Sequence, residues 1–130
     1  MINNKFLLYV GLALLITGII LGALGAHALK TMLNEQQFDS FKTGVFYQLL
    51  HSAIFISFGL SSQSLHQNKT FKAGTTMAIT GVLLFSVSIY VLSISAVYDI
   101  SLRWLGPVTP LGGLLMIAGW SVVFASFLKK

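Results

Sequence analysis

Two histidines occupy positions from which they could contribute to one ligand-binding or proton-binding site. His27 lies near the end of the glycine-rich stretch GALGAHALK, and His51 lies in the next apolar segment, behind Tyr47 and Gln48. Gln48 and His51 are three residues apart, so they share one face of a helix. If this helix crosses a membrane, the imidazole must face protein or water and must find partners. A functional site and a purely structural hydrogen bond to a neighbouring helix both remain open for His51.

A metal site needs more ligands than these two histidines supply, and haem ligation by both is disfavoured because their expected depths in the membrane differ by roughly 8 Å. A zinc-type site takes three or four ligands, and any further ligand would have to come from the acids Glu35, Asp39 or Asp99. No helix carries a His-x-x-x-His or Glu-x-x-His pair, and the chain has no cysteine. We therefore expect neither a metal nor any other cofactor.

Enzymatic and transport chemistry is also weakly represented. Ser52 adjoins His51 in the chain, but consecutive residues point about 100° apart around a helix, so the serine is poorly placed as a nucleophile. A proton-coupled exporter needs a carboxylate inside the membrane, whereas all three acids fall in expected loops. A histidine could carry the proton instead. We expect a protein without enzymatic activity, and a small transporter is our third interpretation.

Our first interpretation is a partly polar pocket that opens toward the outer membrane face and binds a lipid, a quinone or another amphipathic molecule. The residues that would line it are His27, Tyr47, Gln48, His51, Tyr90 and Arg103. The alternative is a structural protein that packs against other helices, as a homo-oligomer or as an assembly factor of a membrane complex.

The composition indicates an integral membrane protein. Of 130 residues, 55% are hydrophobic and only 8% are charged, whereas soluble domains carry roughly 25% charged residues. Each of the long apolar runs has about 18 residues or more, enough to cross the ~30 Å of membrane hydrocarbon. We predict one domain over residues 1–130, an all-α membrane bundle of four helices at about residues 5–29, 43–61, 73–98 and 108–128.

Small residues recur along the predicted helices at spacings that favour close helix packing. The glycines expected at helix contacts are Gly11, Gly18, Gly22, Gly25, Gly74, Gly81, Gly112 and Gly119. Similar residues in the two halves of the chain also suggest an internal repeat of two helices each. It aligns Gly18 with Gly81 in the first helix of each half, and Ser52 with Ser121 in the second.

Residues 31–42 have a different pattern from the apolar runs. Asn34 and Gln37 resemble a helix-capping box. Phe38 and Phe41 fall on one side of the following turns, whereas Glu35 and other charged residues point elsewhere. We expect a short amphipathic helix that lies on the outer membrane interface between the first two spanning helices.

The net charge of +5 does not form a basic stripe, so nucleic-acid binding is not expected. One predicted side of the membrane holds Lys5, Lys69, Lys72, Lys129 and Lys130. The other side holds Lys30, Lys42 and Arg103 together with all three acids. Because positively charged loops stay in the cytoplasm, we expect a multi-pass protein of the cell membrane with both termini inside.

Four motifs in order along the chain resemble one known family. The strings GALGAHALK, TGVFYQLLH, LLFSVSIY and LGPVTPLGG, the last followed by GW, are similar to the transmembrane protein 256 family, also catalogued as domain of unknown function 423. The resemblance implies a small multi-helix membrane protein and leaves the activity open. Ala28 and Val87 stand where glycine is common in the family, which implies looser helix packing there.

Overall fold

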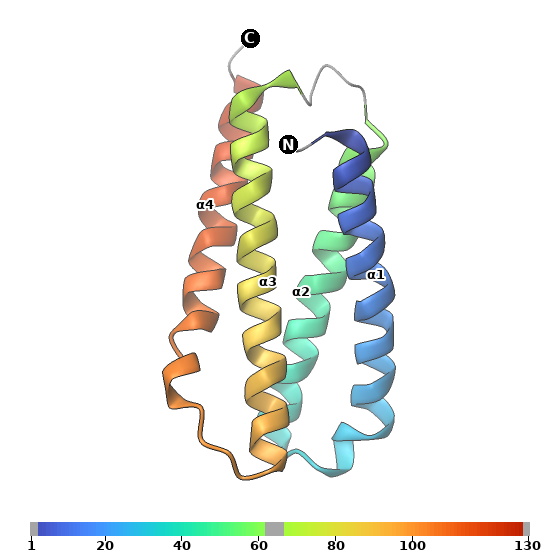
Figure 1. The fold of residues 1–130 in the computed structure, drawn as a ribbon, viewed down its shortest axis with the longest axis vertical. Coiled ribbons are helices and arrows are strands. Elements are labelled where there is room, and N and C mark those ends of the chain that lie inside the picture. The colour runs from blue at the N-terminus through green and yellow to red at the C-terminus, as the bar shows by residue number, and fades with distance from the viewer. Residues whose placement is uncertain (1–2, 62–66, 129–130) are drawn as a thin grey trace.

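The computed structural model describes residues 3–61 and 67–128, and in these ranges the chain forms four long helices (Figure 1). Their bounds are Asn4–His27 for α1, Glu35–Gly59 for α2, Lys69–Val97 for α3 and Val108–Leu128 for α4. Two short 3₁₀ helices, Leu29–Thr31 and Arg103–Leu105, lie in the connections at the end where α2 and α4 begin. The all-α four-helix prediction is confirmed.

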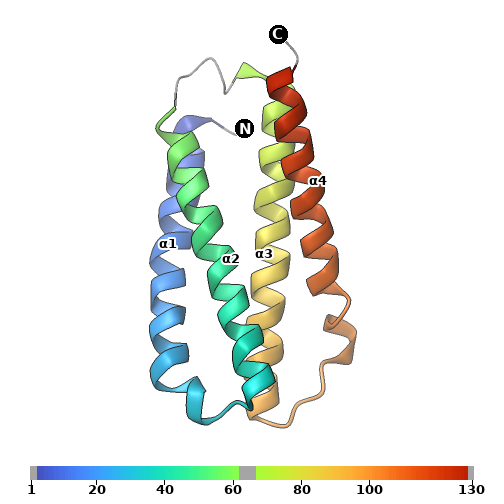
Figure 2. The ribbon, with the colours of Figure 1, turned by 180° about the vertical axis from the view of Figure 1, so that it is seen from behind.

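The bundle consists of two helix pairs. α1 packs along α2, α3 packs along α4, and α2 and α3 form the main contact between the pairs (Figures 1 and 2). Within the described residues, three helical segments are long and apolar enough to cross a membrane: Asn4–His27, Lys69–Val97 and Arg103–Leu128. α2 is equally long, at 25 residues, but its first turns carry charged and amide side chains.

The amphipathic segment is not a separate interfacial helix, and this prediction was wrong. Asn34 caps α2 itself. Its side-chain oxygen accepts from the backbone N–H of Gln37, and the Gln37 side-chain oxygen accepts from the backbone N–H of Asn34. The helix then continues without a break through Thr43, because Phe41 is buried against Gly25 of α1 and holds the first turns in the bundle. α2 therefore begins eight residues earlier than the expected start at 43.

Glycines stand where the paired helices approach most closely. A Cβ at Gly11 would lie 2.8 Å from the Ile56 backbone nitrogen, and one at Gly81 would lie 2.6 Å from that of Met116. Similarly short distances apply at Gly18, Gly25, Gly74, Gly112 and Gly119. Gly22 differs, because a Cβ there would meet only a Val45 methyl group at an ordinary 3.5 Å.

The glycine contacts of the two pairs correspond to each other. The contact of Gly11 with Ile56 corresponds to the contact of Gly74 with Val123. In the same way, the contact of Gly18 with Leu49 corresponds to that of Gly81 with Met116. These contacts support a repeat of the helix pair, but they place α2 and α4 in a register that differs by two residues from the alignment of Ser52 with Ser121. The serine alignment therefore reflected similar composition and not equivalent positions.

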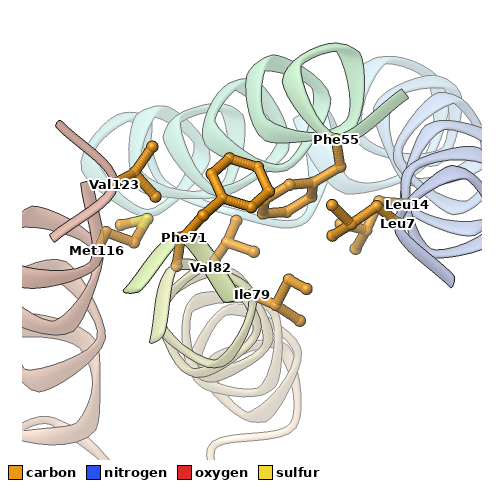
Figure 3. Packing of buried hydrophobic residues seen from close by; sticks show 9 residues of the cluster. Leu7, Leu14, Phe55, Phe71, Ile79, Val82, Met116 and Val123 are labelled. Carbon is orange, nitrogen blue, oxygen red and sulfur yellow. The ribbon is translucent and has the colours of Figure 1, made fainter. Parts of the chain in front are cut away.

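Two apolar clusters fill the bundle and leave a polar layer between them. In one cluster, Phe55 of α2 and Phe71 of α3 lie between the helices, with Leu7 of α1 and Met116 of α4 beside them (Figure 3). The second cluster gathers near the start of α2 and includes Phe41. Buried polar side chains of α2 lie between the clusters, and they define the candidate site.

Candidate functional site

A cleft of about 580 Å³ lies between α2 and α4. It exists because these two helices make few direct contacts, so α3 forms its floor. Its lining includes Tyr47 and His51 of α2, Phe85 of α3, and Gly113, Ile117 and Trp120 of α4. The missing side chain at Gly113 adds to the space, since the nearest atom to a Cβ there would be 3.9 Å away.

His51 forms the polar wall of this cleft. Its Nδ1 lies 2.7 Å from the Tyr47 carbonyl oxygen, and the Trp120 indole donates to its Nε2 at 2.9 Å. A carbonyl only accepts and an indole N–H only donates, so Nδ1 carries the proton and Nε2 is the acceptor. The imidazole is therefore neutral, with both nitrogens engaged. Binding of a proton or metal at Nε2 would require loss of the Trp120 hydrogen bond.

The His51 and Trp120 pair joins the two halves of the bundle. Among residues 3–61 and 67–128, it is the one side-chain hydrogen bond between α2 and α4. The two rings also pack at a centroid distance of 5.6 Å, and Phe55 lies 6.0 Å from the imidazole. His51 thus combines the two roles left open by the sequence, since it links helices and faces a cleft.

Gln48 and Tyr90 belong to a second polar network, inside the bundle. The Gln48 amide nitrogen donates to the Leu14 carbonyl at 2.9 Å and to the Thr17 hydroxyl at 2.8 Å. Its amide oxygen accepts from the Tyr90 hydroxyl at 2.8 Å. Because the Leu14 carbonyl cannot donate, the orientation of the amide is fixed. Gln48 thereby ties α1, α2 and α3 together and does not line the cleft.

His27 and Arg103 lie apart from both networks. Gly25, two residues before His27, packs on Phe41, which precedes His51 by ten residues or about 15 Å of helix. The His27 and Arg103 side chains are exposed, at the end of the bundle where α2 begins. The six residues expected in one pocket therefore occupy three places, and only Tyr47 and His51 share a cleft.

A second hollow of about 380 Å³ lies closer to the start of α2. Its lining is more polar, with Gln36, Ser40 and Thr43 of α2, Ser93 of α3 and Thr109 of α4. Sequence reasoning missed Ser93 and Trp120. Small residues recur every seven positions at Gly74, Gly81, Ser88 and Ser95, and Ser93 could have been noticed because it lies outside this series. No sequence signal paired Trp120 with His51.

The titratable groups do not assemble into a metal-binding cluster in the part of the chain that the structure describes. No group of three or more histidine, aspartate or glutamate side chains is close enough there to hold an ion. The chemistry that this site offers is apolar contact, ring stacking and a few hydrogen bonds.

Comparison with known proteins gives a consistent match. Residues 21–113 match the family model described as protein of unknown function (DUF423). A UPF0382 membrane protein of Haemophilus influenzae is 34% identical over 129 residues, which cover 98% of each chain. The UPF0382 membrane protein YwdK of Bacillus subtilis is 35% identical over 118 residues, 90% of this chain and 89% of that one. No solved structure matches significantly.

Proposed function

The chain belongs to the DUF423 family of membrane proteins, and from this premise we propose that it binds a lipid or similar amphipathic molecule in the cleft between α2 and α4. The observation that carries the proposal is the cleft itself, about 580 Å³ with aromatic and aliphatic walls and one polar side. No step of this function requires catalysis or a cofactor.

The chemistry of the walls favours an acyl chain. Phe85, Ile117 and Trp120 offer apolar contact, and an apolar hollow without an occupant forfeits dispersion contacts on every wall. In a bilayer, the groups that surround the protein and can fill this cleft are the acyl chains of lipids. Because both His51 nitrogens are already engaged, we assign His51 to the wall of the cleft and no longer to the binding of a head group.

The test is the amount of lipid that stays bound after purification in mild detergent, measured by native mass spectrometry. Gly113→Leu places a side chain in the cleft, and we expect it to lower lipid retention at least fivefold. Leu114→Phe adds bulk on the next residue, which is 63% exposed on the outside of α4, and should leave retention unchanged. Wild-type protein that carries no lipid, or equal retention by both variants, would refute the proposal.

We also propose that both termini face the cytoplasm. In the described chain, Lys5, Lys69 and Lys72 lie at the end where α1 and α3 begin, and Lys30, Lys42 and Arg103 lie at the other end. Lys129 and Lys130 fall outside the described residues. They follow the end of α4 in the sequence, and counting them gives the first side five cations against three, so the positive-inside rule favours the first side as the cytoplasmic one. A green fluorescent protein fused after residue 130 should fluoresce, and an alkaline phosphatase fusion there should be inactive; the reverse pattern would show the opposite orientation.

A further inference from the structure

We propose that the cleft continues into a head-group site around Ser93, and that this site takes the uncharged, hydroxyl-bearing or ester-bearing head of a lipid in preference to an anionic phosphate. The inference rests on the proposed function, since it names the class of lipid whose tail occupies the cleft. It is carried by the alignment of the two hollows, an unsatisfied buried hydroxyl and the charges of an adjoining hollow.

The two hollows follow one another along the same helix faces. On each of three helices, a residue of the second hollow lies four residues from a residue of the cleft: Thr43 and Tyr47 on α2, Ile89 and Phe85 on α3, and Thr109 and Gly113 on α4. Residues four apart lie on the same helix face, one above the other. A single elongated molecule can therefore contact both hollows.

The combined length of the two hollows matches one leaflet of a membrane. From Gln36 in the second hollow to His51 in the cleft, α2 advances 15 residues, or about 22 Å. Half of the hydrocarbon core plus one interfacial region is about 20 to 22 Å thick. A lipid of this leaflet would have its tail in the apolar cleft and its head at the polar hollow.

Ser93 is the exception among the buried polar side chains. It is only 4% exposed and lines the second hollow. Each of the other buried polar side chains makes a hydrogen bond, including Ser86 to Gly44 and Ser95 to Leu92. Within the described residues Ser93 makes none. Buried hydroxyls in native proteins almost always have a partner, so the hydroxyl points to a polar group supplied by a bound molecule.

The groups around Ser93 are neutral hydrogen-bonding groups. The second hollow is lined by the amides of Gln36 and Gln37 and by the hydroxyls of Ser40, Thr43 and Thr109, with no charged side chain. Arginine and lysine, which usually bind phosphate, are absent from this lining. A hydroxyl head suits such a surface, since Ser93 can donate to it, and the Ser40 and Thr43 hydroxyls, which already donate to backbone carbonyls, can accept from it. Ester and carbonyl oxygens can accept from Ser93.

The charges of an adjoining hollow also disfavour an anionic head. An adjoining hollow shares Gln36 and Thr43 with the head-group site and is lined by Glu35 and Asp39. Asp39 pairs with Lys42 at 2.7 Å, so the three charges sum to −1 beside the site. A phosphate would meet this negative charge without a cation of its own, whereas a hydroxyl head would not.

Two lipids that differ only in the head group provide the test. Protein is reconstituted in phosphatidylcholine nanodiscs with equal amounts of diacylglycerol and phosphatidic acid of identical acyl chains, and the lipids retained on re-extraction are measured by mass spectrometry. We expect wild type to retain diacylglycerol at least fivefold over phosphatidic acid. Ser93→Ala should reduce the retained diacylglycerol about fivefold, the size expected for one hydrogen bond, without lowering the melting temperature.

Ser95→Ala is the matched control. Ser95 is a buried serine of the same helix, but its hydroxyl bonds to the Leu92 carbonyl and lines neither hollow; its removal should leave the lipid ratio unchanged. If wild type retains no lipid, phosphatidylcholine included, the proposed function itself fails. If Gly113→Leu still blocks lipid retention but wild type shows no head-group preference, or Ser93→Ala keeps the wild-type ratio, the cleft function stands and the head-group site is refuted. The last result is expected if Ser93 only binds water.

Discussion

Gly112→Ala is expected to lower the free energy of unfolding by about 3 kcal/mol, the upper range for overpacking a tight contact. A Cβ at Gly112 would lie 2.5 Å from the Phe85 backbone nitrogen and 2.9 Å from the Gly81 carbonyl oxygen. Backbone atoms cannot rotate away as side chains do, so α3 and α4 must move apart. The separation also disturbs the matching contact of Gly81 on Met116. Titration with sodium dodecyl sulfate from mild-detergent micelles, followed by circular dichroism, measures the loss.

The adjacent glycine is a nearly ideal control for this substitution. A Cβ at Gly113 would be 3.9 Å from its nearest neighbour, a Phe85 ring atom. Gly113→Ala should therefore leave the helix contact intact and stabilise α4 by up to about 1 kcal/mol, because alanine favours helix over glycine. Equal effects of the two substitutions would show that α3 and α4 do not pack through Gly112.

The sequence predicted the helices best where apolar runs end at strong boundary residues. α4 was expected at 108–128 and lies there, because Pro107 and Pro110 suit the start of a helix. The start of α2 was wrong, since the polar residues after Asn34 were interpreted as an interfacial surface. They instead continue the same helix and line the second hollow. A polar helix face has the same periodicity whether it meets water or a groove.

The sequence predicted which residue types form the candidate site but not which side chains bond to one another there. His51 was identified because an imidazole within an apolar run needs partners, and it has two. A pocket shared with His27 was expected, but Gly25 beside His27 packs on Phe41, about 15 Å of helix before His51. The Trp120 partner depends on how α4 is rotated about its axis, and the seven-residue glycine spacing does not determine which neighbouring residue faces α2.

Loss of the hydrogen bonds of Gln48 is expected to weaken the link between three helices. Gln48→Met keeps the volume of the side chain but leaves the Tyr90 hydroxyl, 7% exposed, without its acceptor. A buried group left unsatisfied costs about 1 to 3 kcal/mol, so we expect a loss of about 2 kcal/mol in the free energy of unfolding. Tyr90→Phe removes the donor and should cost about 1 kcal/mol. The same detergent titration measures both variants.

The double variant decides whether these two residues act as a unit. Once Gln48 is methionine, the Tyr90 hydroxyl has lost this acceptor, so its removal should not lower the free energy of unfolding further. The loss in the double variant should therefore be about 1 kcal/mol smaller than the sum of the two single losses. Tyr47→Phe is the control, because the Tyr47 side chain is 37% exposed and its hydroxyl makes no hydrogen bond within the described residues; we expect a change within about 0.5 kcal/mol. Strict additivity would mean that the Gln48 amide does not hold the Tyr90 hydroxyl, and that this pair adds nothing to the hydrogen bond from Ser86 to Gly44 that also joins α3 to α2.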